Sequence, residues 1–139
     1  MASIAPETTS TELPEELTQA VEGFFNRIPF NRLLGIEIDT LRSDCVAMSL
    51  AMRPELIGNF TQGILLLDVC GGAMALIGAF ERHAHLSVQE RMIRLAKLGT
   101  IDLRVDYLRP GRGEHFVCTS VLLRSGNKVG VVRSELHAN

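Results

Sequence analysis

The segment Ile64–Phe80 reads ILLLDVCGGAMALIGAF, and its only charged residue is Asp68. It is slightly short for a membrane span, which needs about 20 apolar residues, and it also contains three glycines. A helix that is apolar all round must be covered on most sides. The segment therefore predicts a helix, ending near residue 83, that is buried in the core of a soluble domain.

The residues before this segment predict a helix and a β-hairpin. Apolar side chains recur at helical spacing over residues 12–28, and Pro29 ends this helix because proline cannot donate the next backbone hydrogen bond. A short turn is expected over residues 30–35. Apolar and polar residues then alternate over 36–39 and 46–52, on either side of a turn at Ser43–Asp44. The polar residues 1–11 are expected to form a flexible N-terminus, followed by a single domain over residues 12–139.

The residues after the segment predict a short helix and three strands. Ser87 and Glu90 have the spacing of a helix capping box. Alternation predicts strands over Thr100–Leu108, His115–Arg124 and Val129–His137, joined by turns rich in glycine and polar residues. The fold class is therefore α+β, with an antiparallel sheet wrapped around the buried helix. The exposed edge of this sheet is expected to pair with a second subunit.

Composition and charge exclude several classes of protein. Apolar residues make up 46% and charged residues 22% of the 139, which is typical of a globular domain. A net charge of −2 gives no broad basic field, so nucleic acid is not an expected partner. The short apolar segment with its charge and glycines makes a membrane an unexpected partner as well. The three cysteines form no C-x-x-C pair and the acidic N-terminus does not resemble a signal peptide, so a cytoplasmic location is expected.

Three groups of residues are candidates for chemistry. Asp68 is a carboxylate in an apolar helix, and is either a functional acid or an ordinary acid near a helix N-terminus. The glycine-containing loop ahead of the helix could present backbone N–H groups to a ligand, or could be an ordinary turn. Two turns carry cationic and amide groups that could bind phosphates or could be solvated surface. No histidine or cysteine set has metal-ligand spacing, so these residues support a carboxylate-based hydrolase or a binding domain without deciding between them.

Three motifs resemble a known family. They are GN-x(3)-GIL…LLDVCGGAMAL from Gly58 to Leu76, TIDLRVDYLRPGRGE from Thr100 to Glu114, and LLRSGNKV from Leu122 to Val129. Together they resemble the hotdog-fold thioesterases of the PaaI-like type, and within it the YigI-like branch of bacterial acyl-CoA thioesterases. The resemblance covers roughly residues 12–137 and implies a hotdog fold.

The resemblance implies an activity and a site. The enzyme would hydrolyse a medium- or long-chain fatty-acyl or an aryl CoA thioester without a cofactor, as a homodimer or a dimer of dimers with its active site at the subunit interface. Asp68 would be the catalytic general base or nucleophile, and Asn59 would orient the carbonyl or the water. The implied residues for substrate and CoA binding are Gly63, Leu65, Arg109, Pro110, Gly111, Arg112, Asn127 and Lys128.

One departure from the family pattern keeps an alternative open. The family has a His-Gly-Gly segment at the point where Leu66 directly follows Leu65 in this sequence. Its loss would remove a backbone N–H that polarises the thioester carbonyl. The departure favours a non-catalytic acyl-CoA-binding or structural hotdog module, whereas the retained Asp68 favours the enzyme.

Overall fold

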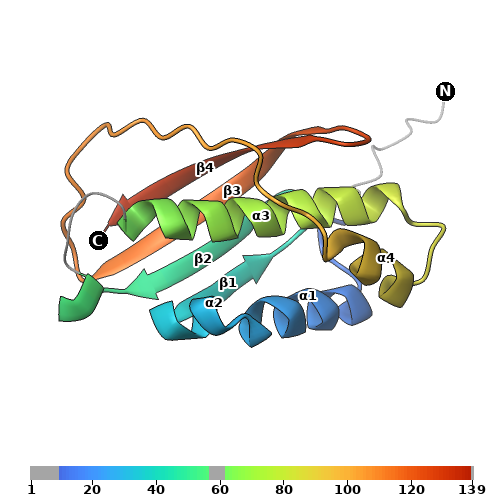
Figure 1. Cartoon of the computed structure of the whole chain (residues 1–139), viewed down its shortest axis with the longest axis horizontal. Helices are drawn as coiled ribbons and strands as arrows, with labels where there is room; N and C mark the ends of the chain where they lie inside the picture. Colours follow the sequence, from blue (N-terminus) through green and yellow to red (C-terminus); the bar gives the residue numbers. More distant parts are fainter. Residues whose placement is uncertain (1–9, 57–61, 139) are drawn as a thin grey trace, which may run out of the picture.

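A four-stranded antiparallel sheet with a long helix lying across it forms the centre of the molecule (Figure 1). The computed structural model describes residues 10–56 and 62–138. Along the chain the elements are α1 (Glu15–Arg27), α2 (Pro29–Leu34), β1 (Ile36–Leu41), β2 (Val46–Ala51), a 3-10 turn (Pro54–Leu56), α3 (Gln62–Arg82), α4 (Val88–Leu95), β3 (His115–Ser125) and β4 (Gly130–Ala138). The strand order β1-β2-β3-β4 follows the sequence, and every neighbouring pair is antiparallel. The predicted α+β class is confirmed.

The core lies between α3 and the sheet. Side chains at helical spacing on α3 are buried together with alternate residues of β2 and β3, which are Leu66, Cys70, Ala73, Met74, Ile77 and Phe80 on the helix and Val46, Met48, Leu50 and Cys118 on the strands. Truncating a side chain as large as Phe80 here would cost about 3–5 kcal/mol. The predicted buried helix is confirmed, and no helix in the described ranges is both long enough and apolar enough to cross a membrane.

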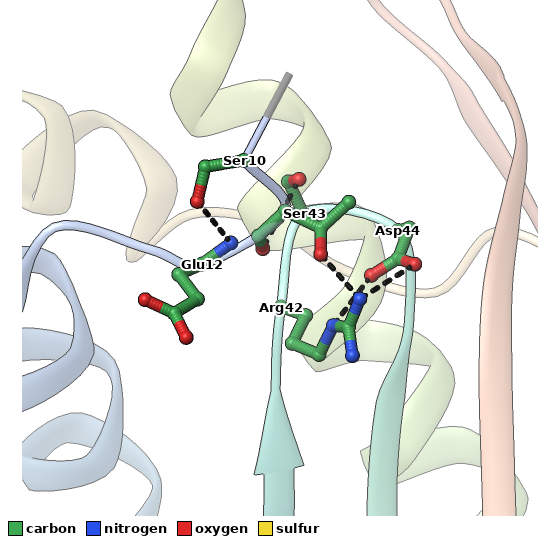
Figure 2. A network of polar contacts seen from close by, with 6 residues as sticks. Ser10, Glu12, Arg42, Ser43 and Asp44 are labelled. Carbon is green, nitrogen blue, oxygen red and sulfur yellow. Dashed lines mark hydrogen bonds and ion pairs between the residues drawn. The ribbon is translucent and has the colours of Figure 1, made fainter. Parts of the chain in front are cut away.

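Residues just before α1 are held against the β1–β2 hairpin. The predicted helix over 12–28 is shorter in the structure, because Glu12 lies in an isolated antiparallel bridge with Arg42 and α1 begins only after Pro14. Ser43 N donates a hydrogen bond of 2.9 Å to the carbonyl oxygen of Thr11. Arg42 Nε donates a hydrogen bond of 3.0 Å to Oδ1 of Asp44, within the group of polar contacts drawn in Figure 2. The start of α1 is therefore anchored to the sheet.

A second short helix occupies the residues expected to form a turn. Pro29 ends α1 and also begins α2, since a proline at the first helical position loses only a hydrogen bond that would be missing anyway. The Asn31 side chain donates to the carbonyl oxygen of Phe25 at 3.1 Å, which ties α2 to the end of α1. Gly35 ends α2 with a φ of 71°, a left-handed conformation that favours glycine.

The strand predicted over Thr100–Leu108 is wrong for this structure. Residues 100–114 form an irregular segment that passes from α4 to the start of β3 along the top of Figure 1. Its alternating apolar side chains lie largely in solvent, with Ile101 80% and Leu103 42% exposed. A strand requires a neighbouring strand for its backbone hydrogen bonds, and alternation of side chains alone does not supply one. The two strands predicted after this segment are confirmed as β3 and β4.

Candidate active site

Asp68 lies on the side of α3 that faces away from the sheet. Cys70 points into the core and its thiol contacts the carbonyl oxygen of Cys118 at 3.4 Å, whereas Asp68 is half-buried beside α1 and α4. Because α3 begins at Gln62, Asp68 is about 9 Å from the helix start, and the helix dipole acts mainly within the first turn. The helix N-terminus therefore does not account for a carboxylate at position 68.

Thr100 holds the Asp68 carboxylate. The Thr100 hydroxyl donates a hydrogen bond of 2.7 Å to Oδ1 of Asp68, from the segment that follows α4. A hydrogen bond to a carboxylate is stronger than one between neutral groups and fixes its orientation. In the sequence Thr100 stands only as the first residue of a predicted strand, so sequence reasoning missed this partner.

An apolar cleft opens beside the two residues. Its volume is about 210 Å³, and within the described ranges Asp68 and Thr100 are the only polar side chains that line it. The apolar lining comes from three helices and the residues just after them, and consists of Phe24, Phe25, Ile28, Val69, Gly72, Leu76, Leu95 and Leu98. A carboxylate at the edge of an apolar cleft can activate water against a substrate whose apolar part lies in the cleft.

Two local features fix the walls of the cleft. In α1, Leu17, Val21 and Phe25 are buried at helical spacing, which holds that helix against the core. In α4, Ser87 and Glu90 form the predicted capping box, and the side chain of Ser87 accepts from the backbone N–H of Glu90 at 3.2 Å. The hydrogen bonds from Ser87 hold the pKa of the Glu90 carboxyl below its ordinary value.

The Arg91 guanidinium secures α4 to α3. It lies 3.8 Å from the centre of the Phe80 ring and donates to the carbonyl oxygen of Phe80 at 3.1 Å. A cation over an aromatic face is attracted by the ring electrons. The capping box at the start of α4 and the Arg91 contacts along it therefore position this wall of the cleft together.

The two groups of residues predicted to bind CoA lie at opposite ends of β3. The residues Arg109, Pro110, Gly111 and Arg112 precede the start of β3 at His115, whereas Asn127 and Lys128 lie in the turn after Ser125. An 11-residue strand is about 33 Å long, so one chain does not bring the two groups together. Asn127 and Lys128 instead line an open hollow of about 350 Å³ with Arg124.

Asp68 lies nearer to the arginine end. Cys70 of α3 contacts Cys118, and a Cβ at Gly78 would meet Leu122, so α3 and β3 run in the same direction. Asp68 precedes Cys70 on the helix and therefore lies toward the beginning of β3. Among the predicted CoA-binding groups, Arg109–Arg112 is thus at the same end of the fold as Asp68.

The remaining predicted residues lie at or before the start of α3. Gly63 and Leu65 belong to its first turn, and α3 continues without a break through Leu65 and Leu66. Asn59 lies outside the described residues, so its role in orienting the carbonyl or the water stays a prediction.

A buried group of thiols and hydroxyls lies on the opposite side of α3. The Ser120 hydroxyl donates to the sulfur of Cys70 at 3.2 Å and lies 2.6 Å from the hydroxyl of Ser134. A hydrogen bond with Cys70 and burial together raise the pKa of the Cys118 thiol. The predicted core position of Cys70 is confirmed, and within the described ranges no three His, Cys, Asp or Glu side chains are grouped as a metal site requires.

Curated relatives match most of the chain. The medium/long-chain acyl-CoA thioesterase YigI of Escherichia coli K12 is 46% identical over 123 residues, which span 84% of this chain and 79% of the relative. The protein of the same name from Salmonella typhimurium is 45% identical over the same shares. No model of a known protein family matches the chain.

Solved structures agree with these relatives. A protein from Shewanella oneidensis described as related to the thioesterase superfamily is 44% identical, with a TM-score of 0.77 over 89% of this chain and 86% of its own. The Escherichia coli PaaI protein is 15% identical with a TM-score of 0.68, over 90% of this chain and 83% of its own, and shows the fold alone. The sheet with its central helix is a hotdog fold. The chain belongs to the hotdog-fold thioesterase superfamily and to its YigI-like branch.

Proposed function

We propose that the protein is an acyl-CoA thioesterase that acts on medium- and long-chain acyl groups, with Asp68 as its catalytic residue. The single observation that carries the proposal is the Asp68 carboxylate, oriented by Thr100 at 2.7 Å beside an apolar cleft. The names of the curated relatives support the same reaction class. The apolar lining suits a fatty-acyl chain better than a polar acyl group.

The proposed role of Asp68 is general base catalysis. Thr100 engages Oδ1, so Oδ2 is the oxygen that takes a proton from water as the water oxygen bonds to the thioester carbonyl carbon. The carbon–sulfur bond then breaks, and the CoA thiolate recovers the proton from Asp68. Direct attack of Asp68 on the carbonyl, with water cleaving the resulting anhydride, is the nucleophilic variant of the same assignment.

The CoA moiety is proposed to bind beyond Asp68 toward Arg109 and Arg112. These arginines lie at the same end of β3 as Asp68, and guanidinium groups suit phosphates because they offer several donors in one plane. Asn127 and Lys128, at the far end of β3, are proposed to reach a CoA bound mainly by another copy of the chain. Alanine at both arginines should raise KM for acyl-CoA more than it lowers kcat.

The protein is proposed to act as a homodimer or a dimer of dimers. Residues 100–108 keep the alternation of a strand while Ile101 and Leu103 are exposed, so a second copy could supply both a backbone partner and an apolar cover.

Three free thiols agree with the expected cytoplasmic location.

Measuring both turnover and binding tests the function. Free thiol should be released from octanoyl-CoA and palmitoyl-CoA, faster than from phenylacetyl-CoA as the aryl comparison. If calorimetry shows that octanoyl-CoA binds but no thiol is released, the protein is a non-catalytic acyl-CoA-binding module and not an enzyme. If the protein neither binds octanoyl-CoA nor releases thiol, the proposed function is wrong and the structural-module alternative remains.

A further inference from the structure

Gly72 lines the cleft one helical step of four residues after Asp68, and neither its backbone nor its packing requires glycine. Its φ is not in the left-handed region. Apart from its two chain neighbours and the backbone of its own helix, no heavy atom of the described chain would lie within 4 Å of a Cβ built at Gly72. Glycine inside a helix nevertheless costs stability relative to alanine. The missing side chain therefore needs another explanation.

At the other two glycines of α3 beyond its first turn, Gly71 and Gly78, close packing against the sheet explains the absence of a side chain. A Cβ at Gly71 would lie 3.1 Å from a methyl carbon of Val132, and one at Gly78 would lie 2.5 Å from a methyl carbon of Leu122. Those two positions let α3 lie close to β4 and β3. Gly72 faces the cleft instead, where no described residue fills the space in front of it.

The open space in front of Gly72 is part of a cleft that extends along α3. Asp68, Gly72 and Leu76 all line it and are four residues apart, so each step along α3 advances by about 6 Å. A thioester carbonyl beside Asp68 would therefore place at Gly72 the acyl carbons that lie about 6 Å beyond the carbonyl, which an octanoyl chain has and a butyryl chain does not. Leu76, which is almost completely buried, lies at the next step.

We infer that Gly72 is a specificity-determining position, whose missing side chain leaves room for the part of an extended aliphatic acyl chain that lies about 6 Å beyond the reacting carbonyl. This inference rests on the proposed function. The cleft, at about 210 Å³, is smaller than the roughly 300–1,000 Å³ of sites for drug-sized ligands, so it holds only the part of a long chain nearest the thioester. A side chain at position 72 would obstruct chains that reach it and spare shorter ones.

The test is the ratio of kcat/KM for octanoyl-CoA to kcat/KM for butyryl-CoA. Gly72→Leu should lower this ratio by about tenfold or more, because a few methylenes in an apolar pocket have at least that effect. Gly72→Ala should shift it in the same direction by less, and is the second variant if Gly72→Leu does not fold. Gly23→Leu is the matched control, since Gly23 lies on α1 outside the lining and an added Cβ there meets only the flexible end of Arg27.

The possible outcomes separate the inference from the proposed function. An unchanged ratio in folded Gly72→Leu, or an equal change in Gly23→Leu, would overturn the inference while leaving the proposed function intact. If the wild-type protein releases thiol from neither substrate, the proposed function fails and the inference fails with it. A lower ratio confined to the Gly72 variants, with melting temperatures close to that of the wild type, supports the inference.

Discussion

The hydroxyl of Thr100 donates a 2.7 Å hydrogen bond to Oδ1 of Asp68, which joins the segment after α4 to the second turn of α3. The bond spans 32 positions in the sequence. It orients one oxygen of the Asp68 carboxylate. The site therefore depends on how α4 packs against α3.

Removing this hydroxyl should impair catalysis without unfolding the protein. Thr100→Val keeps the shape of the side chain but loses the donor, so kcat should fall about tenfold, the effect of losing roughly 1.4 kcal/mol of orientation. Thr100→Ser keeps the donor and should retain most of the activity. Equal rates for Thr100→Val and the wild type would show that the hydrogen bond has no role in turnover.

Two glycines of α3 should respond to alanine with opposite signs. Gly72→Ala should raise the free energy of unfolding by up to about 1 kcal/mol, because the added methyl meets open space and alanine favours the helix. Gly78→Ala should lower it by about 1–3 kcal/mol, because the methyl would lie 2.5 Å from Leu122. Urea unfolding of both variants checks this, and two changes of the same sign would contradict the assignment of the two helix faces.

Alkaline pH should destabilise the fold through Cys118. The contact with Cys70 and burial raise the pKa of the Cys118 thiol, so above the ordinary thiol pKa of about 8.5 the folded state keeps a proton that the unfolded state loses. The free energy of unfolding should then fall with rising pH, by at most about 1.4 kcal/mol per pH unit from this thiol. Cys118→Ala should flatten the slope above a pH of about 8.5, measured by urea unfolding at several pH values. An unaltered slope would rule out the thiol as its source.

The exposed segment 100–108 should be needed for self-association. Lysine at both Ile101 and Leu103 places charges where an apolar cover is expected, and should convert the proposed dimer into a monomer. Leu33→Lys is the control, since Leu33 is similarly exposed but lies on α2. Sedimentation of the three proteins checks this. A wild-type monomer at micromolar concentration, or a dimer that survives the double change, would contradict it.

The core can be predicted from the sequence because it is local in origin. A helix formed by the apolar residues around Asp68 is apolar on all sides and must therefore be buried. The alternation in Val46–Leu50 places the apolar side chains on one face of a strand, and that face is buried. Asp68 can also be recognised from the sequence, because burying a lone charge in an apolar helix costs free energy unless the charge is paired or hydrogen-bonded.

The differences arise where distant residues decide the structure. Thr100 reaches Asp68 only through the packing of α4, which no local pattern reveals. The alternation in 100–108 is present in the sequence, but pairing depends on a partner strand. Pro29 both ends one helix and begins another, so local residue preferences do not distinguish α2 from a turn.

Catalysis by Asp68 can be tested most sharply by measuring kcat/KM of Asp68→Asn for octanoyl-CoA. Asparagine has the same shape and can still accept from Thr100, but it cannot take a proton from water. We predict a fall of about 10²- to 10⁴-fold with an unchanged oligomer and melting temperature. Activity within a few fold of the wild type would contradict the assignment of Asp68 as the catalytic residue.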